Sequence, residues 1–175
     1  MSAWRPILRE AIVAGTIASL LSTAVLAVCG RIERRDAVGP TNAPSQWLWG
    51  EGAAYETRAT LRHTLVGYVI HHLMSIFWAL VHQGAFGGRA ATRTLPHALA
   101  TGAISAGLAN FVDYRLTPRR LRPGFEKHLS RWSLFAAYAA FGLGLALPAL
   151  MHAGRPPGRL SRRAPRALPR APARR

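Results

Sequence analysis

Four stretches of the chain contain no Asp, Glu, Lys or Arg, and each is long enough to cross a lipid bilayer as a helix. They are residues 11–30, 63–88, 94–112 and 132–154, which are 20, 26, 19 and 23 residues long. About 20 apolar residues in a helix span the hydrocarbon core of a membrane. We therefore predict an all-α membrane protein in which four transmembrane helices form a compact bundle, and we exclude a soluble globular domain. The expected spans are about 8–29, 64–84, 95–112 and 131–151.

The first stretch allows two other interpretations. Arg5 and Arg9 precede it, as basic residues precede the core of a secretory signal peptide. Leu26–Cys29 resembles the processing site of a lipoprotein, although Val28 stands where such a site has a small residue. The apolar run is longer than the core of about 7–15 residues in a signal peptide, so we favour a retained helix. Cys29 is the single cysteine, which excludes an intramolecular disulfide.

The connections between the spans differ in length and composition. Residues 31–62 form the first connection, and Ser45–Gly50 within it carries Trp47 and Trp49. Because tryptophan prefers the membrane–water interface, we expect a short interfacial helix here, with Trp47, Trp49 and Glu51 at the interface. The connection after the second span is short and rich in glycine. It predicts a tight antiparallel hairpin of spans two and three.

The C-terminal residues have a composition of their own. Residues 155–175 hold eight of the 23 basic residues and little that can be buried. We expect a disordered Arg/Pro tail behind a membrane domain of residues 1–154. The tail can contact anionic lipid headgroups. It has no aromatic side chains to stack on bases, so the net charge of +16 indicates a lipid bilayer as the partner, not nucleic acid.

The distribution of basic residues gives an orientation. With four spans, both termini and the 89–93 connection share one side, and they hold two, eight and two basic residues, or 12. The other two connections hold five and six, or 11. Basic residues are enriched on the cytoplasmic side of a membrane protein. The tail decides the choice, and we predict a multi-pass protein of the bacterial inner membrane with both termini in the cytoplasm.

Small residues recur at every fourth position in three of the predicted spans. The rows are Ala11, Gly15, Ser19, Thr23 and Ala27, then Ala98, Gly102, Ala106 and Asn110, and then Ala136, Ala140 and Gly144. Such rows let helix backbones approach closely in lipid. We expect them to pack the bundle, and the same faces allow a homo-oligomer. An alanine-rich composition also produces such rows by chance.

The second span carries a polar and aromatic stripe along one face. Steps of three and four residues connect Thr64, Tyr68, His71, Ser75, Trp78 and His82. His71 and the adjacent His72 fall near the middle of the span, where polar side chains face the bundle interior and need partners. With polar residues of the third span, the candidate polar site comprises Tyr68, His71, His72, Ser75, His82, His97, Asn110 and Asp113.

These histidines have several functional interpretations and one structural interpretation. They fit ligation of haem b, binding of a metal, a proton path, or binding of a small solute. They equally fit hydrogen bonds between helices that fix the register of the bundle, which we favour. His71 has no second histidine at its depth in span three. The protein is therefore expected to be structural or accessory, with a small-solute or proton pathway as the first alternative and a haem b or metal-binding protein as the second.

The sequence carries no pattern of a known catalytic or metal site. It contains no HExxH, CxxC, GxSxG or P-loop. No nucleophile, base and orienting group stand at a recognisable spacing. We predict no catalytic residues, no metal ligands, no bound cofactor and no enzyme with a covalent or metal-assisted mechanism.

Three segments carry a resemblance to known membrane proteins. They are Thr41–Gly50 (TNAPSQWLWG), Leu61–His72 (LRHTLVGYVIHH) and Asp113–Leu121 (DYRLTPRRL). With them the chain resembles a family of uncharacterised small inner-membrane proteins of proteobacteria, and in the layout of residues 5–150 it resembles the YagU-like inner-membrane proteins. The resemblance implies a location and an architecture, and it implies no catalytic residues.

A carbonate wash of membranes tests the four-span prediction. We expect the protein to stay in the membrane pellet, because helices of about 20 apolar residues are held by the hydrocarbon core. Release into the soluble fraction would contradict the prediction. A mature chain that begins near Cys29 would instead support the signal-peptide interpretation.

Overall fold

The computed structural model describes residues 4–87 and 94–153, and every regular element in these ranges is helical. Three helices are long and apolar enough to cross a membrane: α1 (Trp4–Arg34), the stretch Leu61–Phe86 that contains α4 (Val66–Phe86), and α6 (Arg131–Ala153). The all-α prediction is thus confirmed. The fourth predicted span is α5 (Leu95–Phe111), whose 17 residues are about 26 Å long and shorter than a hydrocarbon core of about 30 Å. The predicted tail, residues 155–175, lies outside the described residues.

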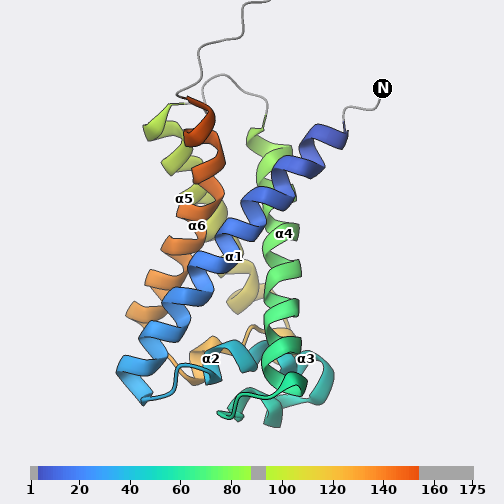
Figure 1. The fold of residues 1–175 in the computed structure, drawn as a ribbon, viewed down its shortest axis with the longest axis vertical. Helices are drawn as coiled ribbons and strands as arrows, with labels where there is room; N and C mark the ends of the chain where they lie inside the picture. Colours follow the sequence, from blue (N-terminus) through green and yellow to red (C-terminus); the bar gives the residue numbers. More distant parts are fainter. Residues whose placement is uncertain (1–3, 88–93, 154–175) are drawn as a thin grey trace, which may run out of the picture.

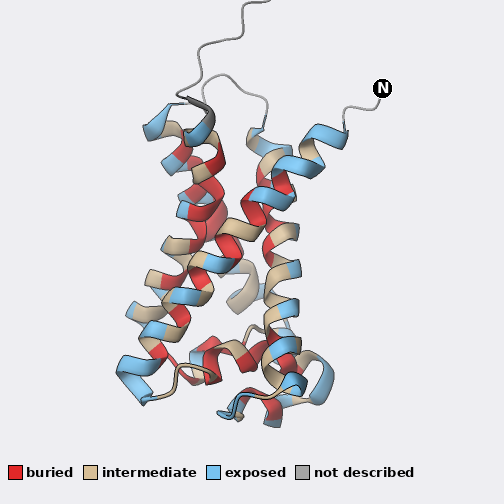
Figure 2. Ribbon diagram, in the orientation of Figure 1, coloured by how far each residue is buried: buried red, intermediate tan, exposed pale blue. Residues whose placement is uncertain are grey.

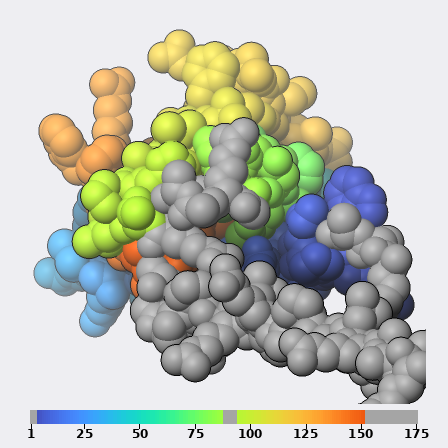
Figure 3. Space-filling model, turned by 90° about the horizontal axis from the view of Figure 1, so that it is seen from above, coloured from blue at the N-terminus to red at the C-terminus, as the bar shows by residue number. Residues whose placement is uncertain are grey.

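The long helices run side by side and alternate in direction (Figure 1). α1 begins and α6 ends at the same end of the bundle, which is the upper end in Figure 1. Figure 3 looks onto this end, where the last residues of α4 lie between the first residues of α1 and those of α5. The four helices α1, α4, α5 and α6 run alternately in opposite directions, so the first begins and the last ends at the same end of the bundle (Figure 1).

The opposite end is closed by the two connections, residues 36–60 and 117–130, which we call the end layer. Its elements are α2 (Gly39–Asn42), α3 (Gln46–Trp49) and 3-10 turns at Ala43–Ser45, Glu51–Tyr55, Arg119–Leu121 and Phe125–Lys127. Two π-helical turns, Leu61–Leu65 and Val112–Leu116, join it to α4 and α5. The short turns of the first connection pack on those of the second. The end layer is therefore one structure built from two distant parts of the chain.

The helix expected around Trp47 and Trp49 is only one turn long. Pro40 and Pro44 lie at the first positions of their turns, where the missing N–H is tolerated, and they break the segment into short pieces. Gly50 ends α3 with a φ of +86°, a conformation that favours glycine. The first connection is therefore a series of compact turns, and α3 is the short helix expected around the two tryptophans.

α1 is the central helix of the bundle. It packs along both α4 and α6, and α5 packs along α6. α4 and α5 touch each other much less, so they do not form the closely packed hairpin that the short connection predicted. Residues 88–93 of that connection lie outside the described residues. The reason for the difference is that α1 and α6 present the small faces that α4 and α5 need for close packing.

Glycines mark the points of closest approach between these helices. A Cβ atom on Gly15 would lie 2.6 Å from the Cα atom of Ile76 in α4, and one on Gly142 would lie 2.8 Å from the carbonyl oxygen of Gly102. Gly144 packs in the same way on the backbone of Ala18 in α1. The rows predicted in α1 and α5 are confirmed as contact faces at Gly15 and Gly102. In α6 the predicted row is confirmed as a contact face at Gly144, whereas Ala136 and Ala140 are only half-buried.

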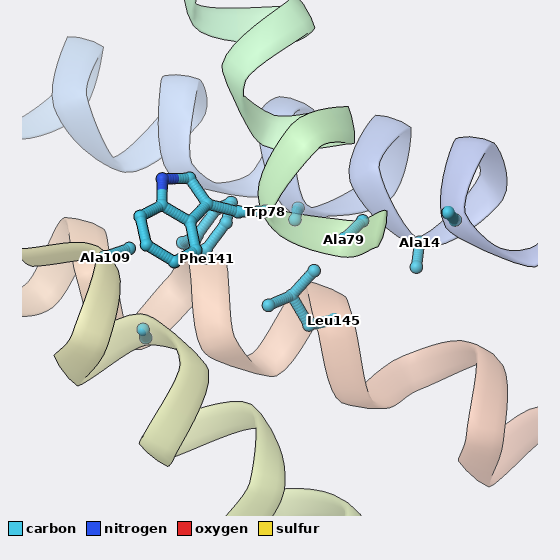
Figure 4. Close-up of a cluster of buried hydrophobic side chains, with 9 residues drawn as sticks. Ala14, Trp78, Ala79, Ala109, Phe141 and Leu145 are labelled. Atoms are coloured by element: carbon cyan, nitrogen blue, oxygen red, sulfur yellow. The ribbon is translucent and has the colours of Figure 1, made fainter. Parts of the chain in front are cut away.

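The apolar core lies where α1, α4, α5 and α6 meet. Figure 4 shows Trp78 and Phe141 side by side, with Leu145 and three alanines around them. Trp78 is 7% exposed and Phe141 is 6% exposed. Buried residues line the inner faces of the helices and the inside of the end layer, whereas the outer faces are exposed (Figure 2).

The exposed outer faces of the helices are themselves apolar. Large hydrophobic side chains point outward from every long helix, among them Leu8, Ile12, Leu20, Leu73, Phe77, Ile104, Leu108, Phe135 and Leu143. Trp4 near the start of α1 and Trp132 near the start of α6 lie at opposite ends of the bundle and are strongly exposed. Apolar outer faces with tryptophan near both ends suit contact with a lipid bilayer.

The close approach at Gly102 can be tested against a matched glycine in the same helix. Gly102→Ala should lower the free energy of unfolding by about 1–3 kcal/mol, because its new methyl group meets the backbone of Gly142. Gly107→Ala should leave it unchanged or raise it, because no atom lies within 4 Å of the new methyl group and alanine favours the helix. Thermal unfolding of both variants in detergent measures the difference. Equal effects would contradict the packing of α5 on α6.

Candidate functional site

A cavity of about 60 Å³ lies inside the bundle, above the end layer. Four long helices, the π turn after α5 and the end layer all contribute to its wall. Beside the tryptophans Trp47 and Trp78, five of the lining side chains carry polar atoms: Ser22, His71, Ser75, Asp113 and Tyr138. The rest of the wall is mainly apolar and aromatic. The structure thus brings three of the predicted site residues, His71, Ser75 and Asp113, to one cavity.

His71 is held by a serine of α1. Its Nε2 atom lies 2.9 Å from Oγ of Ser22, and Oγ of Ser22 donates to the carbonyl oxygen of Ala18 at 2.7 Å. A hydroxyl group has one hydrogen to donate, so Ser22 accepts from the Nε2–H of His71 in this arrangement. A neutral His71 then has a lone pair on Nδ1. The ring of Phe125 contacts the imidazole edge-on, with ring centroids 5.6 Å apart.

Asp113 is held by a tyrosine of α6. The hydroxyl group of Tyr138 donates to Oδ2 of Asp113 at 2.6 Å. Tyr138 is about 10 Å along α6 from Arg131, counted at 1.5 Å per residue, so Asp113 lies about two helical turns inside the bundle. Two ion pairs occur within the described residues, and Asp113 belongs to neither. Oδ2 of Asp113 therefore accepts from Tyr138, and the other carboxyl oxygen, Oδ1, takes no part in that hydrogen bond.

The polar stripe of α4 is interrupted beyond the cavity. His82 is buried, and its Nδ1 atom lies 2.9 Å from Oγ of Ser105 in α5. Trp78 stands between Ser75 and His82 on the same face and belongs to the apolar core with Phe141 (Figure 4). The two histidines are thus hydrogen-bonded to different helices, and apolar side chains separate them.

The other predicted site residues lie away from the cavity wall. His72 stacks on Tyr68 with ring centroids 5.7 Å apart, and its Nδ1 atom is buried with no hydrogen-bond partner among residues 4–87 and 94–153. Nε2 of His97 is buried without such a partner in the same ranges. Asn110 is half-buried in the last turns of α5. The structure does not bring these four residues into the site.

Two buried amide side chains connect the parts of the end layer. Asn42 is fully buried; it donates to the carbonyl oxygens of Glu56 and Arg58, and it accepts from the hydroxyl group of Thr64 at 2.7 Å. Gln46 is also fully buried; it donates to the carbonyl oxygen of Arg122 at 2.6 Å and accepts from Lys127 at 2.9 Å. Gln46 thereby ties the first connection to the second beneath the cavity.

The two tryptophans of α3 have different surroundings. Trp47 lines the cavity, and its Nε1 atom donates to the carbonyl oxygen of Arg122 at 3.3 Å. Trp49 is exposed, and the guanidinium of Arg62 lies 4.7 Å from the centre of its ring. Glu51 is exposed in the end layer, where its carbonyl oxygen accepts from Lys127 at 3.5 Å. Of the three residues predicted at the interface, Trp47 faces inward.

Carboxylates at the outside of the end layer have local partners. Glu33, near the end of α1, accepts from the backbone N–H of Ser130 at 2.7 Å, just before α6 begins, and from the hydroxyl groups of Ser130 and Ser133. A carboxylate at a helix N-terminus is favoured by the helix dipole. Glu56 accepts from the backbone and the side chain of Arg58, which holds the pKa of Glu56 below its ordinary value.

Within the described ranges, no group of three or more His, Cys, Asp or Glu side chains is arranged to hold a metal ion. Comparison with protein-family models, curated proteins and solved structures gave no match. The cavity wall offers one imidazole, one carboxyl group, one phenol and two aliphatic hydroxyl groups, beside two indole N–H groups.

Sequence reasoning missed two residues of the site, Ser22 and Tyr138. Ser22 lies three positions after Ser19 in α1 and outside the row of every fourth residue, and this spacing of three was a signal for a shared face. Tyr138 is a polar aromatic residue inside a predicted span, which by itself calls for a partner. Neither signal identified Asp113 or His71 as that partner.

Ser22→Ala should lower the free energy of unfolding by about 1 kcal/mol, because it removes the hydrogen bond between Ser22 and Nε2 of His71. Ser19→Ala is the matched control, one turn away in α1. Its Oγ atom is buried without a hydrogen-bond partner among the described residues, so its removal should have little effect. Thermal unfolding in detergent compares the two. A larger effect for Ser19→Ala would overturn the assignment of the Ser22–His71 hydrogen bond.

Proposed function

We propose that the protein is a four-span protein of the bacterial inner membrane with an accessory role, and that the polar cavity of its bundle is a binding site and not part of a continuous pathway. The four-span topology is supported by the outer face of α5, which presents Leu99, Ile104 and Leu108. With the π turn that follows, the helical stretch 95–116 has 22 residues, or about 33 Å at 1.5 Å each. That length suits a hydrocarbon core of about 30 Å.

In this proposal both termini face the cytoplasm and the end layer faces the periplasm. The common end of the first and last helices supports a shared side for the termini (Figure 1). The basic residues of 155–175 then face the anionic lipid headgroups of the inner leaflet. The likeness to proteobacterial inner-membrane proteins rests on Thr41–Gly50, Leu61–His72 and Asp113–Leu121 alone. A homo-oligomer would use the small residues of α5 that point outward, such as Ala103 and Gly107.

The single observation that carries the assigned role is the apolar barrier beyond the cavity. A proton or solute path along α4 needs polar groups or water at each step. Trp78 lies between His71 and His82 along α4, and it packs with Phe141 and Leu145 in the apolar core (Figure 4). A mainly apolar cavity that carries a few polar groups and ends at a packed apolar cluster suits binding better than passage.

The haem alternative receives less support from this geometry. Bis-histidine ligation needs two imidazoles on opposite sides of the iron. One imidazole, that of His71, lines the cavity, and its Nε2 atom is bound to Ser22. The adjacent His72 stacks on Tyr68 outside the cavity wall. An absorption spectrum of the purified protein tests this, and a Soret band with stoichiometric iron would favour haem.

Proton flux into liposomes tests the role of the cavity. Liposomes that contain the pure protein should take up protons no faster than liposomes without protein, because the cluster around Trp78 blocks the bundle. His71→Ala and His63→Ala serve as a matched pair, since His63 lies in the π turn before α4 and bonds to Thr60. Robust flux that His71→Ala abolishes and His63→Ala preserves would contradict the proposal and favour the pathway.

A further inference from the structure

We propose that the cavity binds a small organic cation, namely a primary or methylated ammonium ion of about four non-hydrogen atoms. The proposal deepens the binding role given above. It rests on the hydrogen-bond directions, the aromatic wall, the charge and the volume of the cavity, which are independent of one another.

The polar groups of the wall offer acceptors and few donors. The hydroxyl groups of Ser22, Ser75 and Tyr138 donate to Ala18, to the carbonyl oxygen of His71 and to Asp113, respectively. Because Ser22 donates to Ala18, the Nε2–H of His71 donates to Ser22 in the neutral tautomer that carries its hydrogen on Nε2. Lone pairs on Asp113 and on Nδ1 of His71 remain. The Nε1 atom of Trp78 has no partner among the described residues, but it is fully buried and does not reach the cavity surface. An ammonium group, which only donates, complements this wall.

Aromatic rings supply the second part of the recognition. Trp47, Trp78, Phe125, Tyr138 and Phe141 all line the cavity. The face of an aromatic ring carries a partial negative charge and attracts a cation within about 6 Å of its centre. An aromatic wall with one carboxyl group is the usual chemistry of sites for ammonium ligands.

The charge of the wall excludes an anion. Asp113 has no ion-pair partner within the described residues, and His71 is the single basic side chain of the wall. A neutral His71 leaves the carboxylate as the only charge at the cavity. A second anion beside it would be repelled in a medium of low dielectric constant, whereas a cation is attracted.

The volume admits a small ligand. A cavity needs roughly 15 Å³ on this scale to hold one water molecule, so 60 Å³ has room for a ligand of at least about four non-hydrogen atoms. Three probes have this size and differ in charge: isopropylammonium, isopropanol and acetate. The first two have the same shape, so a comparison between them isolates the effect of the charge.

Isothermal titration of the full chain in lipid nanodiscs at pH 8 tests the proposal. At this pH an ordinary carboxyl group is ionised and an ordinary imidazole is neutral. We expect isopropylammonium to bind with a stoichiometry of one and at least ~10-fold more tightly than isopropanol or acetate, as a charge-assisted hydrogen bond provides. Equal binding of isopropylammonium and isopropanol, tighter binding of acetate, or no binding at all would overturn the proposal.

Two variants assign the binding to the cavity. Asp113→Asn keeps an acceptor for Tyr138 but removes the charge, and it should weaken isopropylammonium binding ~10-fold or more. Glu51→Gln removes an exposed carboxylate of the end layer and should leave binding unchanged. Equal effects of both variants would show binding to the surface and overturn the proposal.

A third variant covers the case in which Asp113→Asn fails to fold. Ala137→Leu places a larger side chain in the cavity wall and should abolish isopropylammonium binding while Asp113 stays in place. Helix content and monodispersity of each variant are checked by circular dichroism and gel filtration. Retained binding by a folded Ala137→Leu protein would overturn the proposal. Extraction of the wild-type protein by carbonate would instead contradict the four-span assignment, so the two failures are distinguishable.

Discussion

Close contact between helix backbones determines the rest of this structure. In lipid, helices gain little from burying apolar surface against one another, so they associate through tight packing of small residues. Here α1 presents Gly15 and Ala18 on two faces, one to α4 and the other to α6. Gly102 and Gly142 bring α5 equally near to α6. α1 and α6 therefore form the middle of the bundle, and α4 and α5 lie on their outer sides.

The cavity is a consequence of that arrangement. Because α4 and α5 pack on α1 and α6 and little on each other, the space between them is filled by side chains alone. Toward the upper end Trp78 and Phe141 fill it (Figure 4). Toward the end layer the side chains are smaller or polar, and Ala109, Ala137 and Ser75 leave the space open. The polar groups that remain are paired across helices, which also fixes the helix register.

The end layer adds buried, hydrogen-bonded polar side chains to this apolar bundle. A buried amide that loses its partners costs free energy, so Asn42 and Gln46 admit few alternative packings. His128 connects two further parts of the end layer. Its Nε2 atom lies 2.7 Å from the carbonyl oxygen of Ala54, and its Nδ1 atom lies 3.9 Å from Asp36. Directional hydrogen bonds thus hold one end of the bundle together, and close packing of small and apolar side chains holds the rest.

The class of the fold could be predicted from the sequence, and the pairing of its helices could not. Charge-free length and helical period predict apolar helices close to their observed bounds, because a membrane imposes both. The rows of small residues at every fourth position predicted that Gly15 and Gly102 lie at contacts between helices. They did not reveal which helix each one faces, since a glycine fits any partner. His71 was identified as a polar group inside a span and Asp113 as one at the end of a span, but their partners Ser22 and Tyr138 lie 49 and 25 residues away, and no local pattern indicates such a distance.

The extensive pairing of α1 with α6 has a consequence for biosynthesis. The two helices are the first and the last of the long helices, so in the proposed four-span topology α1 would enter the membrane well before its main partner is translated. Until α6 arrives, the small face of α1 around Ala18 is covered by lipid or by another protein. A nascent chain can assemble α1 with α4 early, but the bundle closes only at the end of synthesis.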